Sequence, residues 1–150
     1  MAESTSLLAG VSGEYYVAAE LSRRGYIASI TLRNTKGIDV LVSNQEVTKQ
    51  VGIQVKTSRV SEDSWMLNKK AEEYYSETLF YIFVHLRGDV DRPNFYIVPS
   101  KVVADYIKQG HSNWLKTPGK KGQKHQDSPI RKFQDADKKY LENWQLLGLD

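Results

Sequence analysis

Four polar residues in the first part of the chain have the types and spacing of a chemical site: Glu14, Asp39, Gln54 and Lys56. Asp39 interrupts one apolar run, and Gln54 and Lys56 interrupt another over residues 51–57. Side chains alternate across a strand, so Gln54 and Lys56 project from one face. A carboxylate such as Asp39 is costly to bury unless a partner compensates its charge. Because the chain has no Cys, a site here would use oxygen and nitrogen groups, and thiolate zinc sites and cysteine nucleophiles are excluded.

A helix is expected to carry Glu14. Small and apolar residues recur through segment 11–22 at the spacing of one helix face, and Gly25 ends the pattern. Glu14 lies near Val11 at the border of this stripe, so it can reach inward. Glu20 falls on the opposite side and is expected to be an ordinary surface residue.

Strands are expected to carry the other three residues. Segments 26–32, 38–42 and 51–57 read as an antiparallel meander, with a turn over residues 34–37. Segment 79–86 is a continuous apolar run and predicts a buried central strand, in which His85 is interpreted as a core histidine.

The remaining segments complete an α/β order. The predicted elements follow the order α-β-β-β-α-β-β-α-α, which favours an α/β sandwich with a mixed sheet over a bundle or a barrel. The later elements are a partly helical segment 65–75, a strand 94–98, a helix 100–109 with Ser100 as N-cap, and a terminal helix 133–147.

Length and composition narrow the class of protein. A chain of 150 residues and 17.1 kDa is expected to form a single domain, residues 1–150. The longest apolar run is too short to span a bilayer, so no membrane association is expected. Residues 1–10 lack a basic start followed by an apolar stretch, and a cytoplasmic location is therefore predicted.

Positive charge is concentrated in one segment. The chain has a net charge of +3, yet residues 101–133 alone hold 8 Lys or Arg against 2 Asp or Glu. Segment 110–132 reads as a basic loop or arm that could bind nucleic-acid phosphates, with a merely solvated loop as the alternative. Trp114 beside it is a candidate for DNA contact. The basic candidates are Lys116, Lys120, Lys121, Lys124, Arg131 and Lys132.

The order Glu14, Gly37-Ile-Asp39 and Gln54-Val-Lys56 resembles the core of the PD-(D/E)XK nuclease superfamily. In that family a helix donates a Glu, the second strand an Asp, and the third strand an acid or Gln, one residue and a Lys. Ile38 stands where the family name has Pro. Gln54 is similar to a variant found in group I intron homing endonucleases of this fold. The resemblance implies a restriction-endonuclease-like α-β-β-β-α-β core with a mixed sheet flanked by helices.

The same resemblance implies a Mg²⁺-dependent (or Mn²⁺-dependent) DNA endonuclease that hydrolyses phosphodiester bonds. Asp39 and Glu14 would hold the metal, with the Val55 carbonyl and the Gln54 amide as further ligands. Lys56 would orient the attacking water or stabilise charge on the phosphate. Cutting two strands with one site per chain favours a homodimer or homotetramer.

Each of these residues also has a structural alternative. Asp39 could terminate a turn, Lys56 could pair with Glu14, and Gln54 could bind a neighbouring strand. The corresponding alternative function is a catalytically inactive nuclease-fold module that binds nucleic acid or a protein partner.

Overall fold

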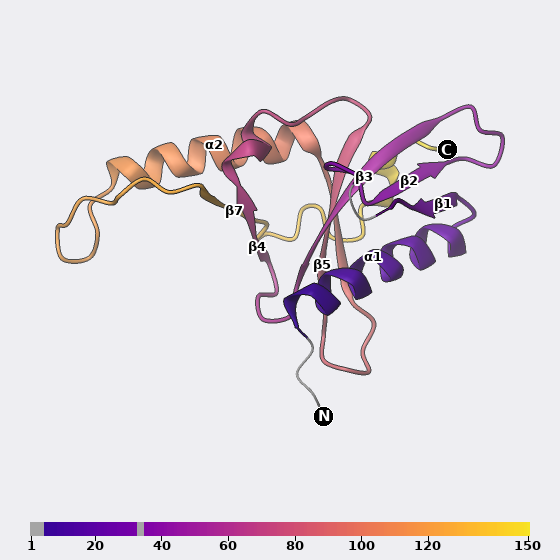
Figure 1. Ribbon diagram of the computed structural model, residues 1–150, viewed down its shortest axis with the longest axis horizontal. Coiled ribbons are helices and arrows are strands. Elements are labelled where there is room, and N and C mark those ends of the chain that lie inside the picture. Colours follow the sequence, from indigo (N-terminus) through magenta and orange to yellow (C-terminus); the bar gives the residue numbers. More distant parts are fainter. Residues whose placement is uncertain (1–4, 33–34) are drawn as a thin grey trace.

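The computed structural model describes residues 5–32 and 35–150 (Figure 1). Asn34, the first residue of the predicted 34–37 turn, lies outside these ranges. The described chain forms these helices and strands in order: α1 Ser6–Arg23, β1 Ile27–Ile30, β2 Val40–Ser43, β3 Gln50–Ser58, β4 Ser64–Asn68, η1 Lys69–Glu72 (a 3-10 helix), β5 Leu79–His85, β6 Asn94–Pro99, α2 Ser100–Lys116, β7 Ile130–Gln134 and η2 Trp144–Leu147 (a 3-10 helix).

A five-stranded mixed sheet forms the centre, in the order β1-β2-β3-β5-β6. The β1, β2 and β3 strands form the predicted antiparallel meander. β3 then runs parallel to β5, and β5 pairs antiparallel with β6. A parallel pair needs a crossover, and here the crossover contains β4 and η1. β4 pairs with β7 in a separate two-stranded ribbon.

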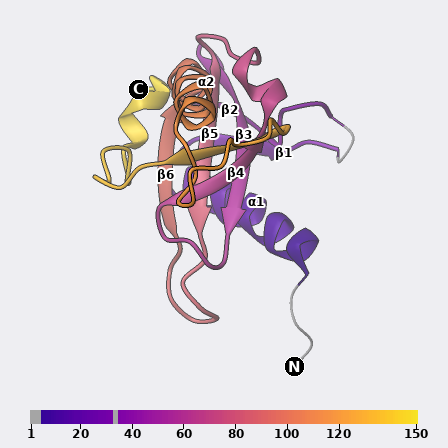
Figure 2. The same cartoon turned by 90° about the vertical axis from the view of Figure 1, so that its left-hand side faces the viewer.

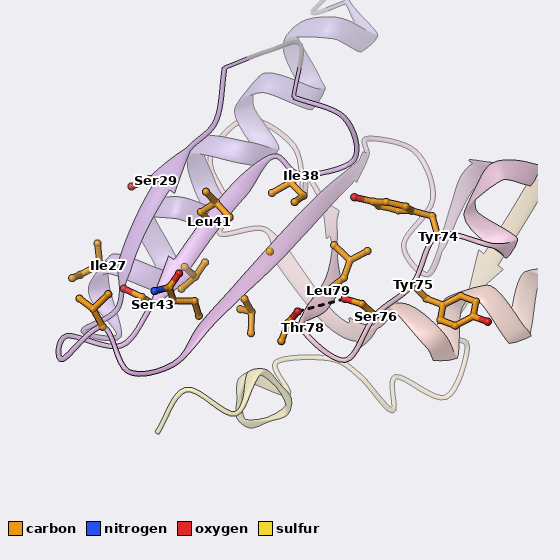
Figure 3. Close-up of a pocket in the computed structure, with 15 residues that line it drawn as sticks. Ile27, Ser29, Ile38, Leu41, Ser43, Tyr74, Tyr75, Ser76, Thr78 and Leu79 are labelled. Atoms are coloured by element: carbon orange, nitrogen blue, oxygen red, sulfur yellow. Dashed lines mark hydrogen bonds between the residues drawn. The ribbon is translucent and has the colours of Figure 1, made fainter.

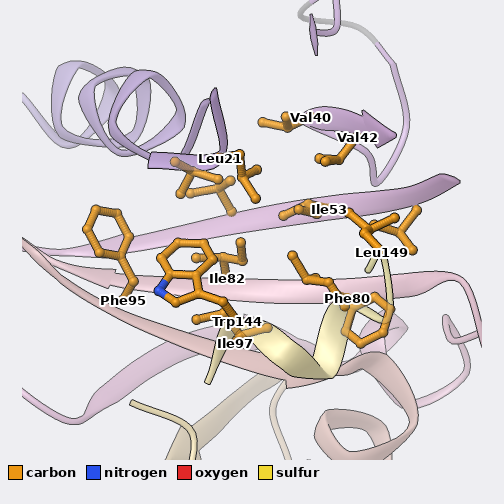
Figure 4. Close-up of a cluster of buried hydrophobic side chains, with 14 of the residues drawn as sticks. Leu21, Val40, Val42, Ile53, Phe80, Ile82, Phe95, Ile97, Trp144 and Leu149 are labelled. Carbon is orange, nitrogen blue, oxygen red and sulfur yellow. The ribbon is translucent and has the colours of Figure 1, made fainter. Parts of the chain in front are cut away.

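The sheet has one helix on each side (Figures 1 and 2). On the first side, Val17 and Leu21 of α1 pack on alternate residues of the strands together with Trp144 of η2 (Figure 4). On the second side, Val103 and Ile107 of α2 pack with the β4–β7 ribbon on the odd-numbered residues of β5. β5 is thus buried on both faces, as its continuous apolar sequence predicted.

Segment 65–75 is helical only over η1, and its first part is a strand. Trp65 and Leu67 point inward while Met66 and Asn68 are exposed. This alternation has the period of a strand, and β7 supplies its partner. The charged residues at 69–73 suggested a helix, but the pairing with a segment more than sixty residues away decides the structure.

The predicted terminal helix 133–147 is wrong. Its beginning belongs to β7, whose Arg131 and Phe133 face inward. Asp135 then ends the strand, because its carboxylate accepts hydrogen bonds from the Lys139 and Tyr140 N–H groups at 3.0 and 2.8 Å. Side-chain capping of this kind favours a turn over a helix. Only η2 near the end is helical.

The helix predicted for 100–109 is longer than expected and begins differently. α2 continues to Lys116, so the basic loop is shortened to residues 117–129. Ser100 is not the N-cap. Its hydroxyl donates to the Ser76 carbonyl at 3.0 Å and accepts from the Ser76 N–H at 3.1 Å, while Pro99 holds the cap position.

Glu20 is buried, which corrects its assignment to the solvent face. Its carboxylate forms salt bridges with Arg92 at 3.0 Å and with Arg24 at 3.7 Å. Arg92 also binds Glu142 at 2.6 Å. These contacts tie α1 to the C-terminal segment. His85 is half-buried, and among the described residues its Nδ1 has no hydrogen-bond partner.

One part of the sheet surface remains uncovered. On the side opposite α1, the strands β1 and β2 leave a hollow of about 450 Å³ lined by Ile27, Ile38, Leu41 and Tyr74, among others (Figure 3). Among the described residues, no helix combines the length and apolarity needed to cross a membrane.

Candidate active site

The main chain of Asp39 is held from both sides just before β2 begins. Its N–H donates to the Ile53 carbonyl at 2.8 Å, and its carbonyl accepts from the Thr31 N–H at 2.9 Å. Gly37, two residues earlier, has a φ of 71°, a conformation that disfavours residues with a Cβ. The Asp39 side chain therefore starts from a fixed backbone.

The Asp39 carboxylate lies where β2 and β3 separate. Its Oδ2 accepts a hydrogen bond from the Val55 N–H at 2.7 Å. The N–H groups of a strand lie in the plane of the sheet, so this carboxylate takes the place of a backbone acceptor between the strands. The carbonyl of a strand residue points to the same side as its N–H, and the Val55 carbonyl therefore faces this gap as well.

Burial raises the pKa of the Asp39 carboxyl above its ordinary value. The Val55 N–H bond and the positive charge of Lys56 oppose this effect but do not cancel it. Removing a carboxylate from water penalises its charged form, whereas a nearby cation or a donated hydrogen bond favours it. The protein thus compensates the charge of Asp39 only in part.

Glu14 shares a pocket with Asp39. The two carboxylate residues line a cavity of about 300 Å³ between α1 and the segment after β1, where Thr31 and Leu32 form another wall. We call this cavity the acid pocket; its remaining lining residues are Ser6, Leu7, Gly10 and Val11. Glu14 is half-buried, as predicted from its place beside the apolar stripe.

Gln54 and Lys56 face the other side of the sheet. The burial of Ile53 and Val55 on the α1 side leaves these two polar residues on the opposite face, as the alternation predicted. Both line a second cavity of about 600 Å³, which we call the lysine pocket. Its lining residues are Lys36, Gly37, Gln54, Lys56, Leu67, Asn68, Lys70, Ala71, Glu73 and Tyr74.

Asp39 lies close to residues of both pockets. It lines the acid pocket, yet it lies close enough to Lys56 of the lysine pocket for the Lys56 charge to act on its pKa. The structure therefore brings Glu14 and Asp39 into one cavity and places Gln54 and Lys56 in the next.

The donor set suits a hard cation that keeps part of its water shell. The two carboxylates and the Val55 carbonyl are oxygen ligands, whereas the Gln54 amide lines the lysine pocket. Mg²⁺ commonly uses one or two carboxylates together with waters and substrate phosphates. No group of three or more His, Cys, Asp or Glu residues that could hold a metal occurs in residues 5–32 and 35–150.

The basic arm projects away from the sheet. The end of α2 and the loop 117–129 extend beyond the body of the molecule (Figure 1). Trp114, 41% exposed, stacks on His125 with ring centroids 4.0 Å apart. The His111 Nε2–H donates a hydrogen bond to the Asp127 carboxylate at 2.7 Å. The lysines of this region are exposed: Lys116, Lys120, Lys121, Lys124 and Lys132.

Arg131 does not belong to this exposed set, although it was predicted to contact nucleic acid. Its guanidinium is buried, binds Glu72 at 2.6 Å and donates to the carbonyls of Ser128 and Ile130. Those bonds fix the ribbon to η1. The neighbouring Lys132 points outward because side chains alternate along β7.

Sequence reasoning missed two residues of the lysine pocket, Lys36 and Lys70. The Lys-Gly pair before Asp39 was a usable signal for Lys36. Lys70 carried no comparable signal, because segment 65–75 was interpreted as partly helical and only the tertiary structure brings η1 beside β3.

Comparison with known proteins shows which fold the chain shares. No protein-family model and no curated protein sequence matches the chain. Among solved structures, the chain is similar to the bacterial homing endonuclease I-Ssp6803I, with a TM-score of 0.56, 16% identity, and 97% of this chain and 94% of that chain covered. The chain has a nuclease fold. This agrees with the restriction-endonuclease-like architecture predicted from the motif order.

A Holliday junction resolvase from Archaeoglobus fulgidus is also similar, with a TM-score of 0.49, 12% identity, and 85% of this chain and 84% of that chain covered.

Proposed function

We propose that the protein is a Mg²⁺-dependent DNA endonuclease that hydrolyses phosphodiester bonds. The observation that carries the proposal is the position of Asp39. This partly buried carboxylate lines one cavity with Glu14, and the charge of Lys56 acts on its pKa. The similarity in fold to a homing endonuclease supports this proposal.

Asp39 and Glu14 would hold the metal ion, with the Val55 carbonyl as a further oxygen donor. The Gln54 amide, expected from the sequence to be another ligand, lines the lysine pocket on the other face of the sheet. The bound Mg²⁺ supplies Lewis-acid activation of water and neutralises charge on the phosphate. Lys56 would orient the attacking water or stabilise the negative charge that develops on the phosphate, a role that suits a compact ammonium group. The Val55 N–H keeps Asp39 oriented through its 2.7 Å hydrogen bond.

The exposed lysines of the arm would bind the DNA backbone at a distance from the reacting phosphate. Two strands require two cuts, so the proposal includes a homodimer or homotetramer.

The experiment is plasmid cleavage with Mg²⁺ or with EDTA, by the wild type and by the Asp39→Asn and Lys56→Gln variants. Nicking or linearisation that requires Mg²⁺ and falls by at least about a hundredfold in both variants is expected. The Asp105→Asn variant is a matched control, because Asp105 is an exposed acid on α2 paired with Lys101 at 2.6 Å. Equal cleavage by the wild type and Asp39→Asn would exclude this site.

A second candidate function is a DNA-binding module without catalysis. The observation in its favour is Gln54, a neutral side chain where an acid would bind a cation more strongly. Mg²⁺ distinguishes the two candidates: a functional site is stabilised by the ion according to its dissociation constant, by about 2.7 kcal/mol at a hundredfold excess over that constant. The binding module would show no such shift, would bind DNA with EDTA present, and would not cut with any divalent ion.

A further inference from the structure

The lysine pocket carries positive charge directly beside Asp39. Lys36, Lys56 and Lys70 enter the same cavity from three different elements, the turn before β2, the strand β3 and the helix η1. The acid that shares the pocket, Glu73, is paired with Lys108 at 3.3 Å. The pocket therefore presents more positive than negative charge to any ligand.

The walls of this pocket are held together by tertiary contacts. Tyr74 packs against Gly37 so closely that a Cβ on Gly37 would lie 2.5 Å from the tyrosine Cε1. The Tyr74 hydroxyl also donates to the Lys36 carbonyl at 3.4 Å. On the opposite wall, the Asn68 side chain accepts from the Lys70 N–H at 3.1 Å. The backbones that carry Lys36 and Lys70 are thus positioned, while their ammonium groups reach water.

We propose that the lysine pocket binds backbone phosphates of the DNA strand next to the phosphate that is cut, with Lys36 and Lys70 as the contacts. The inference rests on the proposed function, because that function places the reacting phosphate at Asp39. Asp39 lines the acid pocket, and Gly37, two residues before it, lines the lysine pocket. A cation in the first pocket and phosphates in the second would have complementary charges. Lysine ammonium groups suit phosphates as point charges without base preference.

This assignment gives the strand a direction across the molecule. From Asp39 the backbone would pass Lys56 and then the pair Lys36 and Lys70. The outer face of the β4–β7 ribbon, which exposes Met66 and Lys132, continues from there toward the arm. The arm and the lysine pocket would then bind separate parts of one DNA molecule.

The test is fluorescence anisotropy of a labelled DNA duplex over a range of salt concentrations, with EDTA present so that no strand is cut. Each phosphate contact adds about 0.9 to the slope of log affinity against log salt. Lys36→Gln and Lys70→Gln are each expected to reduce the slope by about 0.9, and the double variant by about twice that amount. Lys69→Gln is the matched control, because Lys69 precedes Lys70 in η1 but does not line the pocket. The control is expected to keep the wild-type slope.

The inference is overturned if the double variant keeps the wild-type slope, if Lys69→Gln loses as much as Lys70→Gln, or if the wild type does not bind the duplex. Thermal melts of all variants verify that they are folded. A wild type that never cuts, combined with reduced slopes in the two variants, would support the phosphate site and reject the nuclease. Cleavage that depends on Asp39, combined with unchanged slopes, would support the nuclease and reject the phosphate site.

Discussion

Gly13 of α1 lies against Thr57 of β3 so closely that a Cβ on Gly13 would be 1.9 Å from the Thr57 hydroxyl oxygen and 3.1 Å from the Thr57 Cβ. This contact lets the helix rest directly on the strand. Glu14, the next residue of α1, thereby reaches the cavity that Asp39 also lines. The distance between helix and strand is thus a condition for the candidate site.

The Gly13→Ala variant is expected to lower the free energy of unfolding by about 1 to 3 kcal/mol, because the added methyl group overpacks the contact. The loss should exceed the gain of about 1 kcal/mol in helix propensity that alanine brings. Urea denaturation measures the change. Thr57→Ala is the compensating variant: the Thr57 hydroxyl is buried without a hydrogen-bond partner among the described residues, so its removal should recover most of the loss in the double variant. Full additivity of the two changes would contradict this account.

Asp39→Asn is expected to stabilise the protein at neutral pH in the absence of divalent ions. The pKa of Asp39 is raised by burial in the folded state, so its protonated form favours folding and its charged form opposes it. The contribution is favourable below the unfolded pKa and is lost as pH rises through the folded pKa. The amide keeps a carbonyl oxygen that can accept from the Val55 N–H.

Denaturation curves of the wild type and Asp39→Asn at several pH values measure this effect. The stability advantage of the variant should disappear as the pH falls below the ordinary carboxyl value of 3.8, because the wild-type carboxyl is then protonated in both states. A variant that is less stable than the wild type at neutral pH would show that Asp39 is compensated without a cation.

Arg131 and Lys132 are adjacent in sequence and should behave in opposite ways. Arg131→Ala leaves the Glu72 carboxylate, which is largely buried, without its partner at 2.6 Å, and a loss of about 3 to 5 kcal/mol in unfolding free energy is expected. Lys132→Ala should change stability by less than about 0.5 kcal/mol, because the side chain is exposed. In the same DNA titration, Lys132→Ala should reduce the salt slope by about 0.9. A stable Arg131→Ala protein with weakened DNA binding would show that Arg131 contacts DNA, as the sequence predicted.

Glu20→Gln is expected to weaken the connection between α1 and the C-terminal segment. The hydrogen bond from Arg92 lowers the pKa of Glu20 despite its burial. The stabilising contribution is therefore present above the ordinary value of 4.5 and is lost as pH falls through the folded pKa. A loss of about 1 to 3 kcal/mol at neutral pH is expected, and it should shrink in acid. Equal losses at neutral and acidic pH would indicate that the ion pair does not contribute.

Local sequence patterns were sufficient to predict the helix that carries Glu14 and the strand that carries Gln54 and Lys56, whereas Asp39, expected within a strand, lies just before β2. The helical spacing in α1, the strand alternation in β3 and the apolar run of β5 each depend on residues close in sequence, and the side on which Gln54 and Lys56 emerge follows from a period of two. The ordered set Glu14, Asp39, Gln54 and Lys56 indicated a nuclease fold, and a solved nuclease structure shares that fold.

Only the tertiary structure decided the outcome where partners are distant in the chain. Strand pairing made β4 from a segment that was predicted to be partly helical, and β7 from the end of the predicted basic loop and the start of the predicted terminal helix. Arg92, seventy-two residues further along the chain, made Glu20 a buried residue. Arg131 is buried rather than exposed for the same reason, because it forms a salt bridge with Glu72. A residue's charge is visible in the sequence, but its burial and its partners arise from packing between distant segments.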